Sequence, residues 1–167
     1  RQRQMCIRDR NDVISRLIGE LSALHTAARG GDLRSDNKNI QVASLGAETT
    51  RDEANGGYRI DYIYKVDPDY PNRKSVLDDP FLDVKEGDVI TKVNGRDALS
   101  SIDIGELIRN EANKQVKLTI KRDNKSKDII VKPQSNEFWL RYEDWEYSNR
   151  IKVDKASNDE IGYIHLY

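Results

Sequence analysis

The chain of 167 residues carries two histidines, His25 and His165. Imidazole titrates near neutral pH, so either ring could accept a proton from a serine hydroxyl as a general base. His25 follows an apolar pattern with helical spacing and precedes Gly30-Gly31-Asp32, whereas His165 lies in an apolar run typical of a packed strand. Spacing alone assigns no serine or acid to either residue. A lone histidine is more often structural than catalytic, and His165 is the weaker candidate.

Gly46, between Leu45 and Ala47, provides a different kind of chemistry. A glycine here lets backbone amides converge on an anion such as the terminal carboxylate of a peptide. The strand that follows would offer an edge to which the peptide adds. We therefore predict that Leu45, Gly46 and Ala47 bind a peptide.

Composition excludes several other functions. Cys6 stands alone, so it forms neither an internal disulfide nor a thiolate metal site. No phosphate-binding loop, dinucleotide motif or histidine pair at metal spacing occurs. Residues 123–128 lack the central glycine and closing glutamate of a calcium loop, and are interpreted as a hairpin turn. We expect no metal and no cofactor.

Charge excludes further partners. The chain has 28 basic and 29 acidic residues, and this balance argues against nucleic-acid binding. No apolar run approaches the 18 residues that a membrane helix needs, so the sequence predicts a soluble protein. Five aromatic residues lie between Phe138 and Tyr147, and they could stack on bases. Because acids lie among them, we interpret this segment as a packing seam between domains.

These residues need positioning elements, which hydrophobic spacing predicts. We expect a helix from Asn11 to Gly30, capped by Asn11 or Asp12, then strands over 58–66 and 88–94 and a tight turn at Asn94-Gly95. We expect a second helix, capped by Ser101 or Asp103, that carries residues 104–112, and a hairpin of 114–121 and 128–132 around the turn 122–127. A helix to Ala156 and a strand over 161–167 complete the expected elements. Residues 1–10 lack periodicity, and residues 5–10 resemble translated adapter sequence, so we interpret 1–10 as a non-native stub, with a disordered basic tail as the alternative.

The block VKEGDVITKVNG, residues 84–95, together with the Leu45-Gly46-Ala47 loop, a helix and a final hairpin, resembles a PDZ domain. The resemblance implies an α+β fold with a partly open β-barrel or sandwich, and Asp88 is expected to accept hydrogen bonds from turn amides. In this loop Ser44 replaces the first glycine. The sequence leaves open whether the groove binds peptides or the domain only spaces its neighbours.

Two flanking motifs extend the resemblance. ELSALHT, ending with His25, precedes the PDZ-like region, and FWLRYEDWEYSNR and IGYIHL follow it. In this order they resemble the tricorn protease and its bacterial homologues, within the tail-specific serine protease superfamily. In that family the matching histidine is the general base, while the nucleophilic serine lies in a later α/β domain. Archaeal members carry a serine before this histidine, where this chain has Leu24.

The resemblance implies a domain plan and a function. Residues 11–34 would end a helical domain carrying His25, 38–134 would form the PDZ-like domain, 135–159 a connector helix, and 160–167 the first strand of a truncated catalytic domain. The function expected is that of a fragment of a peptide-hydrolysing serine peptidase, inactive alone because its nucleophile lies elsewhere. Expected partners are a peptide substrate, the remaining domains and further copies of the enzyme, in the cytoplasm or exported. The alternative is a non-catalytic PDZ module that binds peptide C-termini.

Overall fold

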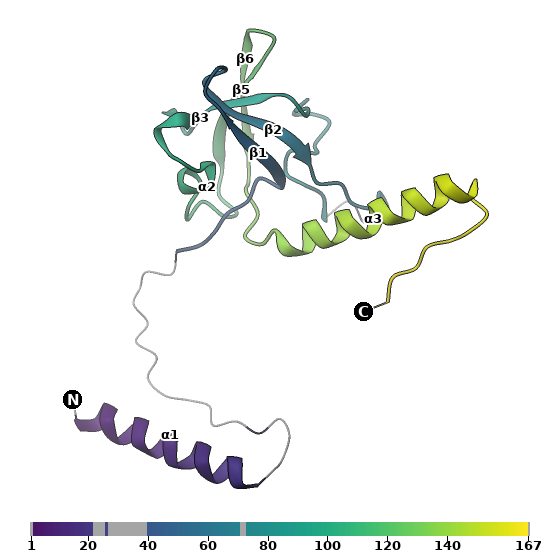
Figure 1. The fold of residues 1–167 in the computed structure, drawn as a ribbon. Coiled ribbons are helices and arrows are strands. Elements are labelled where there is room, and N and C mark those ends of the chain that lie inside the picture. Colours follow the sequence, from purple (N-terminus) through teal and green to yellow (C-terminus); the bar gives the residue numbers. More distant parts are fainter. Residues whose placement is uncertain (1, 22–25, 27–39, 71–72, 167) are drawn as a thin grey trace. The chain divides into compact units, whose positions relative to one another are not determined.

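The computed structural model describes residues 2–21, 26, 40–70 and 73–166. The chain divides into two units, residues 1–39 and residues 40–167, and each is described here by itself (Figure 1). His25 and the Gly30-Gly31 pair lie outside the described residues, so the predicted position of this histidine at the end of a helix stays a prediction.

The first unit contains helix α1, Gln2–Glu20. The expected start and cap at Asn11 are wrong: residues 2–10 contain no glycine or proline and are mostly good helix formers, so nothing interrupts the helix there. The helix ends at Glu20 rather than near Gly30, one residue after Gly19, whose backbone freedom weakens a helix. Val13 and Leu17, on the predicted apolar face, are exposed.

The second unit is built on one antiparallel sheet. Its strands are β1 (Ala47–Asp52), β2 (Gly57–Ile63), β3 (Val89–Val93), β4 (Arg96–Asp97), β5 (Val116–Arg122) and β6 (Lys125–Val131). They lie in the order β1-β2-β3-β5-β6, with β4 paired to β3 (Figure 1). With the helices of this unit, the open sheet confirms the predicted α+β, PDZ-like class.

Apolar residues of the central strands form the core. Ile60 of β2, Ile90 of β3, and Leu118 and Ile120 of β5 are each at most 1% exposed. Along β5 the buried residues alternate with exposed or half-buried ones, as successive side chains of a strand point to opposite faces. Burying each such side chain contributes about 1.5–3 kcal/mol. This core fixes the sheet whose edge strand, β1, follows the predicted binding loop.

Tight turns set the register of two strand pairs. Asn94 and Gly95 both have positive φ, 50° and 80°, and they join β3 to β4 as predicted. The β5–β6 turn differs from the expected one over 122–127. It consists of Asp123 and Asn124 alone, with φ of 46° and 63°, because short polar side chains tolerate this left-handed conformation.

Helix α2, Ile104–Leu107, begins at the predicted cap Asp103, whose carboxylate accepts a hydrogen bond from the Gly105 amide at 2.6 Å. It is shorter than the helix expected over 104–112. Asn110 takes a left-handed conformation, φ 63°, which a continuous helix cannot accommodate. The Asn110 amide instead donates to the Gln41 carbonyl at 2.9 Å, which ties the segment before the binding loop to α2.

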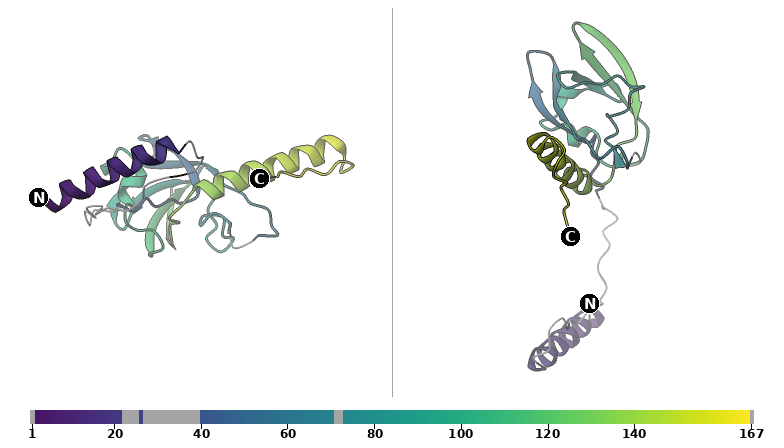
Figure 2. Two further views of the ribbon diagram at one scale, coloured as in Figure 1. Left: turned by 90° about the horizontal axis from the view of Figure 1, so that it is seen from below. Right: turned by 90° about the vertical axis from the view of Figure 1, so that its right-hand side faces the viewer.

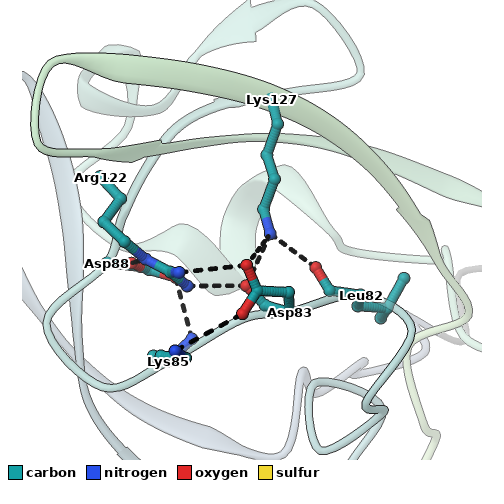
Figure 3. A network of polar contacts seen from close by, with 6 residues as sticks. All are labelled: Leu82, Asp83, Lys85, Asp88, Arg122 and Lys127. Atoms are coloured by element: carbon teal, nitrogen blue, oxygen red, sulfur yellow. Dashed lines mark hydrogen bonds and ion pairs between the residues drawn. The ribbon is translucent and has the colours of Figure 1, made fainter.

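The turn before β3 is held by a buried carboxylate. Asp88 is 1% exposed and accepts a hydrogen bond from the Lys85 amide at 2.9 Å, as predicted for this residue. It also forms a bidentate ion pair with Arg122, at 2.6 and 2.8 Å, which raises the pKa of the guanidinium. In Figure 3, Arg122 and Lys127 of the β5–β6 hairpin both reach toward Asp83. This network joins the turn to the hairpin.

Helix α3, Phe138–Ser157, follows the sheet at the position of the expected helix to Ala156, and its role as a connector between domains stays a prediction. Leu140 is 2% exposed and packs with Tyr64 and Val66. The Asp144 carboxylate accepts hydrogen bonds from the Tyr62 hydroxyl and the Lys65 amide, both at 2.7 Å. In Figures 1 and 2 the later turns of α3 project beyond the sheet. The start of α3 is therefore integral to the second unit.

The segment after α3 and the aromatic residues of α3 differ from the packed strand and the core that their apolar character suggests. Residues 161–166 form no strand within the described chain, in contrast to the expected one, because a strand needs a hydrogen-bonded neighbour and none pairs with this segment. Phe138, Trp139 and Trp145 are about half or more exposed, so they do not pack into the core of this unit. Their role as a seam between domains stays a prediction.

Candidate peptide-binding groove

A groove of about 360 Å³ lies between β1 and α2. Ala47, Glu48 and Thr49 of β1 form one wall, and the other wall runs from the cap of α2 to the residue that follows Leu107. The residues of this second wall are Asp103, Ile104, Gly105 and Ile108. The groove therefore has a backbone edge on one side, and the aliphatic side chains of Ile104 and Ile108 with the Asp103 carboxylate on the other.

β1 is an edge strand. Among the described residues it pairs only with β2, so one row of its backbone groups faces the groove. Such an edge can accept an extended peptide as an additional strand, with main-chain hydrogen bonds giving affinity and side-chain pockets giving specificity. The long loop over 67–80 contributes no residue to the groove among those the structure describes. This arrangement can bind a peptide by sheet extension.

Of the predicted residues, Leu45 and Ala47 line the groove at one end, before and at the start of β1, and Gly46 lies between them without lining it. Gly46 has φ +70°, and a Cβ atom there would lie 2.6 Å from the Ser75 hydroxyl, so only glycine fits. Its amide donates to the Ser44 hydroxyl oxygen at 2.9 Å, and its carbonyl accepts from the Tyr64 amide at 3.1 Å. This amide is therefore already hydrogen-bonded within the protein.

Ser44 ties the start of α3 to this end of the groove, which we name the closed end. Its backbone amide and carbonyl exchange two hydrogen bonds of 2.8 Å with Gln134, which leads into α3. Its hydroxyl donates to the carboxylate of Glu137, the residue that precedes α3. The closed end of the groove is thus formed by a loop of the sheet and by the start of α3.

A group of polar side chains surrounds Glu137. Its other carboxylate oxygen pairs with Arg141, one helical turn further along α3, and the Arg141 guanidinium lies 5.4 Å from the centre of the Tyr64 ring. The Tyr64 hydroxyl donates to Glu48 at 3.3 Å. Burial, followed by the charge of Glu137, raises the pKa of the Tyr64 hydroxyl, and the hydrogen bond to Glu137 raises the pKa of Arg141. The closed end therefore carries carboxylates as well as one arginine.

The remaining candidates lie elsewhere. The His165 ring lies edge-on to Trp145 and Tyr142, with ring centres 5.1 and 5.6 Å apart, so it packs against α3 and not in the groove. In the described part of the chain no cluster of three or more histidine, cysteine, aspartate or glutamate residues could hold a metal ion. No helix among the described residues is long and apolar enough to cross a membrane.

Sequence reasoning missed Glu137 and Arg141 as parts of this groove. Glu137 lies 93 residues from Ser44, and no spacing pattern connects two residues so far apart. The substitution of the first loop glycine by Ser44 was the one available signal, because a hydroxyl at that position needs a hydrogen-bond partner. Nothing in the sequence indicates that this partner is Glu137, the residue that precedes α3.

Comparisons with known proteins agree with the fold and extend beyond it. The family model for the tricorn protease PDZ domain matches residues 43–136. A tricorn protease homologue of Saccharolobus solfataricus is 35% identical over 157 residues, which cover 93% of this chain and 14% of that protein. Tricorn protease homologue 1 of Streptomyces coelicolor is 30% identical over 159 residues, with the same coverage of both chains.

A solved structure supports the same fold. The crystal structure of the tricorn protease superposes with a TM-score of 0.66 at 19% identity, covering 75% of this chain and 12% of that one. At this level of identity the superposition establishes the fold alone. The chain spans 14% of the length of the two homologues described above.

Proposed function

The chain belongs to the tricorn protease family, and from this premise we propose that it is part of a serine peptidase that hydrolyses peptides. The observation that carries the proposal is the extent of the match. The Saccharolobus homologue matches over 93% of the chain, whereas the PDZ domain accounts only for residues 43–136. An isolated peptide-binding domain would have no reason to share its flanking segments with a protease.

In this proposal His25 is the general base. It would take the proton of a serine hydroxyl as the oxygen attacks the peptide carbonyl, and would then give that proton to the leaving amine. The serine would be supplied by a catalytic α/β domain outside these residues, and residues 160–167 would lead into that domain. The chain by itself would therefore show no peptidase activity.

The PDZ-like domain would bind or gate the peptide in the same enzyme. The groove beside β1 supports this role, with Leu45 and Ala47 lining its closed end and Gly46 shaping the loop between them. By resemblance, we expect the complete enzyme to act in the cytoplasm and to assemble from several copies. Residues 11–34 would then be the end of a helical domain, and 135–159 the connector to the catalytic domain.

Histidine substitution in the complete protein tests the catalytic role. Fluorogenic tetrapeptides would be assayed with the wild type, His25→Gln and the matched variant His165→Gln. Removal of a general base costs roughly 10²- to 10⁴-fold in rate, so His25→Gln should lose about 10³-fold in kcat. His165→Gln should leave kcat nearly unchanged. Undiminished turnover by His25→Gln would overturn the assignment.

The groove itself favours a second candidate, a non-catalytic PDZ module that binds peptides. The two functions separate in the same assay. A complete protein that binds peptides through the groove but hydrolyses none, with or without His25, would establish the module and exclude the peptidase.

A further inference from the structure

The closed end of the groove differs chemically from a site for a peptide C-terminus. Capture of a terminal carboxylate needs free amide donors at this end. Here the Gly46 amide donates to the Ser44 hydroxyl, and that hydroxyl in turn donates to Glu137. The Gly46 amide and the Ser44 hydroxyl therefore already have acceptors within the protein, and the last acceptor is the Glu137 carboxylate.

The charges around this end also disfavour a free peptide carboxylate. Three carboxylates line the groove, those of Glu48, Asp103 and Glu137, against the single guanidinium of Arg141. Arg141 is paired with Glu137 and therefore does not offer an unopposed positive charge. One guanidinium offsets only one of the three carboxylates, so a free peptide carboxylate placed at this end would meet a net negative charge, which disfavours binding, whereas a lysine or arginine side chain would meet an opposite one.

The closed end still leaves room for a continuing chain. The Glu137 side chain is 25% exposed and Glu48 is exposed, so both carboxylates at this end are accessible from solvent. The unpaired edge of β1 binds any extended backbone, because its hydrogen bonds need no chain terminus. A peptide can thus pair with β1 and leave the groove over Glu137.

We propose that this groove binds an internal, extended peptide segment with a lysine or arginine side chain directed at Glu137, and that Glu137 excludes a free C-terminal carboxylate. The inference rests on the peptide-binding role proposed above and names its ligand class. Glu137 acts as a specificity-determining residue, and Ser44 and Arg141 hold its carboxylate in place.

Two libraries of random nonapeptides test the proposal on the 167-residue chain. The libraries differ only at the C-terminus, which is a free acid in one and an amide in the other. Binding sequences would be synthesised in both forms with a fluorescein label, and their affinities measured by fluorescence anisotropy. The wild type should bind the amide at least tenfold more tightly than the acid, and selected amides should be enriched in lysine or arginine.

Glu137→Gln is the diagnostic variant, because it keeps a hydrogen-bond acceptor for Ser44 while removing the charge. The preference for the amide over the acid should fall at least fivefold, and the enrichment in basic residues should disappear. Glu160→Gln, the same change at an exposed residue after α3, should leave both unchanged. Thermal unfolding of each variant establishes that the comparison is made between folded proteins.

The outcomes are distinguishable. Tighter binding of free acids by the wild type would overturn the inference while leaving the peptide groove intact. A preference for amides that survives Glu137→Gln would also overturn it, since the discrimination would then lie elsewhere. Binding of neither library by wild type and variant would overturn both the inference and the peptide-binding role of the domain. The catalytic role of His25 is judged independently in the peptidase assay.

Discussion

Asp88 and Glu137 are both carboxylates beside a glycine-containing turn, and their surroundings differ in one decisive respect. The Asp88 side chain is 2% exposed, and its partners are a turn amide and Arg122 of the same domain. The Glu137 side chain is 25% exposed, comes from the start of α3 and lies at the end of a groove. The first carboxylate is enclosed, and the second remains accessible to a ligand.

The difference separates a structural acid from a recognition residue. A buried carboxylate paired in a bidentate way costs stability when its partner is lost, and it has no room for anything else. A half-buried carboxylate that keeps one side open contributes less to stability and can interact with an incoming charge. We therefore expect variants at Asp88 to change the free energy of unfolding, and variants at Glu137 to change peptide preference.

The largest effect should follow Asp88→Ala. The substitution leaves the Arg122 guanidinium and the Lys85 amide without their shared acceptor, and we expect a loss of about 3 kcal/mol in the free energy of unfolding. Urea denaturation measures it. Asp83→Asn, which removes the charge of a carboxylate that is 59% exposed in the same network and suits its positive φ of 45°, should cost much less. Equal losses from the two variants would remove the distinction between enclosed and exposed acids.

A smaller loss should follow Gly46→Ala at the closed end of the groove. The new methyl group would meet the Ser75 hydroxyl and Leu140, and the positive φ adds strain, so we expect a cost of about 2 kcal/mol. Gly95→Ala is the matched control, because its φ of +80° is similar but no heavy atom lies within 4 Å of the added carbon. If Gly95→Ala proves as costly in urea denaturation, crowding at Gly46 is not the cause.

The smallest effect concerns the contact between α3 and β2. Burial, followed by the hydrogen bond to Asp144, raises the pKa of Tyr62 to about 12. An unfolded tyrosine ionises near pH 10. The folded protein therefore keeps this proton where the unfolded chain loses it. The stabilisation that the neutral Tyr62 hydroxyl gives the folded state is present below pH 10 and is lost as the pH rises from about 10 to 12.

Tyr62→Phe checks this sign. The free energy of unfolding of the wild type should fall more steeply between pH 10 and 12 than that of the variant. Tyr70→Phe, at a 55% exposed tyrosine, should follow the wild-type curve. Parallel curves for wild type and Tyr62→Phe would mean that neither burial nor Asp144 holds the hydroxyl in its neutral form.

Local signals in the sequence predicted much of the second unit. The Asn94-Gly95 turn, the Asp103 cap and the hydrogen bond of Asp88 to a turn amide each depend on residues a few positions apart. Residue type and spacing suffice for such features because the chemistry is short-range.

Features that depend on distant partners could not be predicted in this way. Arg122 joins Asp88 from another hairpin, and Glu137 reaches Ser44 across 93 residues. Residues 161–166 form no strand for the same reason, because strand propensity alone does not supply a hydrogen-bonded neighbour. The placement of the Leu45-Gly46-Ala47 loop at the end of a groove agrees with its predicted region, while its role in binding stays a prediction.

Amide chemical shifts test the central claim, a peptide site beside β1, most directly. The ¹⁵N-labelled chain would be titrated with the tightest amidated peptide from the library, and each backbone amide followed in two-dimensional NMR spectra. We predict shifts at Ala47, Glu48 and Thr49 and along the opposite wall at Ile104 and Ile108, with the amides of Asp88 and Arg122 unchanged. Shifts at the Asp88 network with none along β1 would contradict the account.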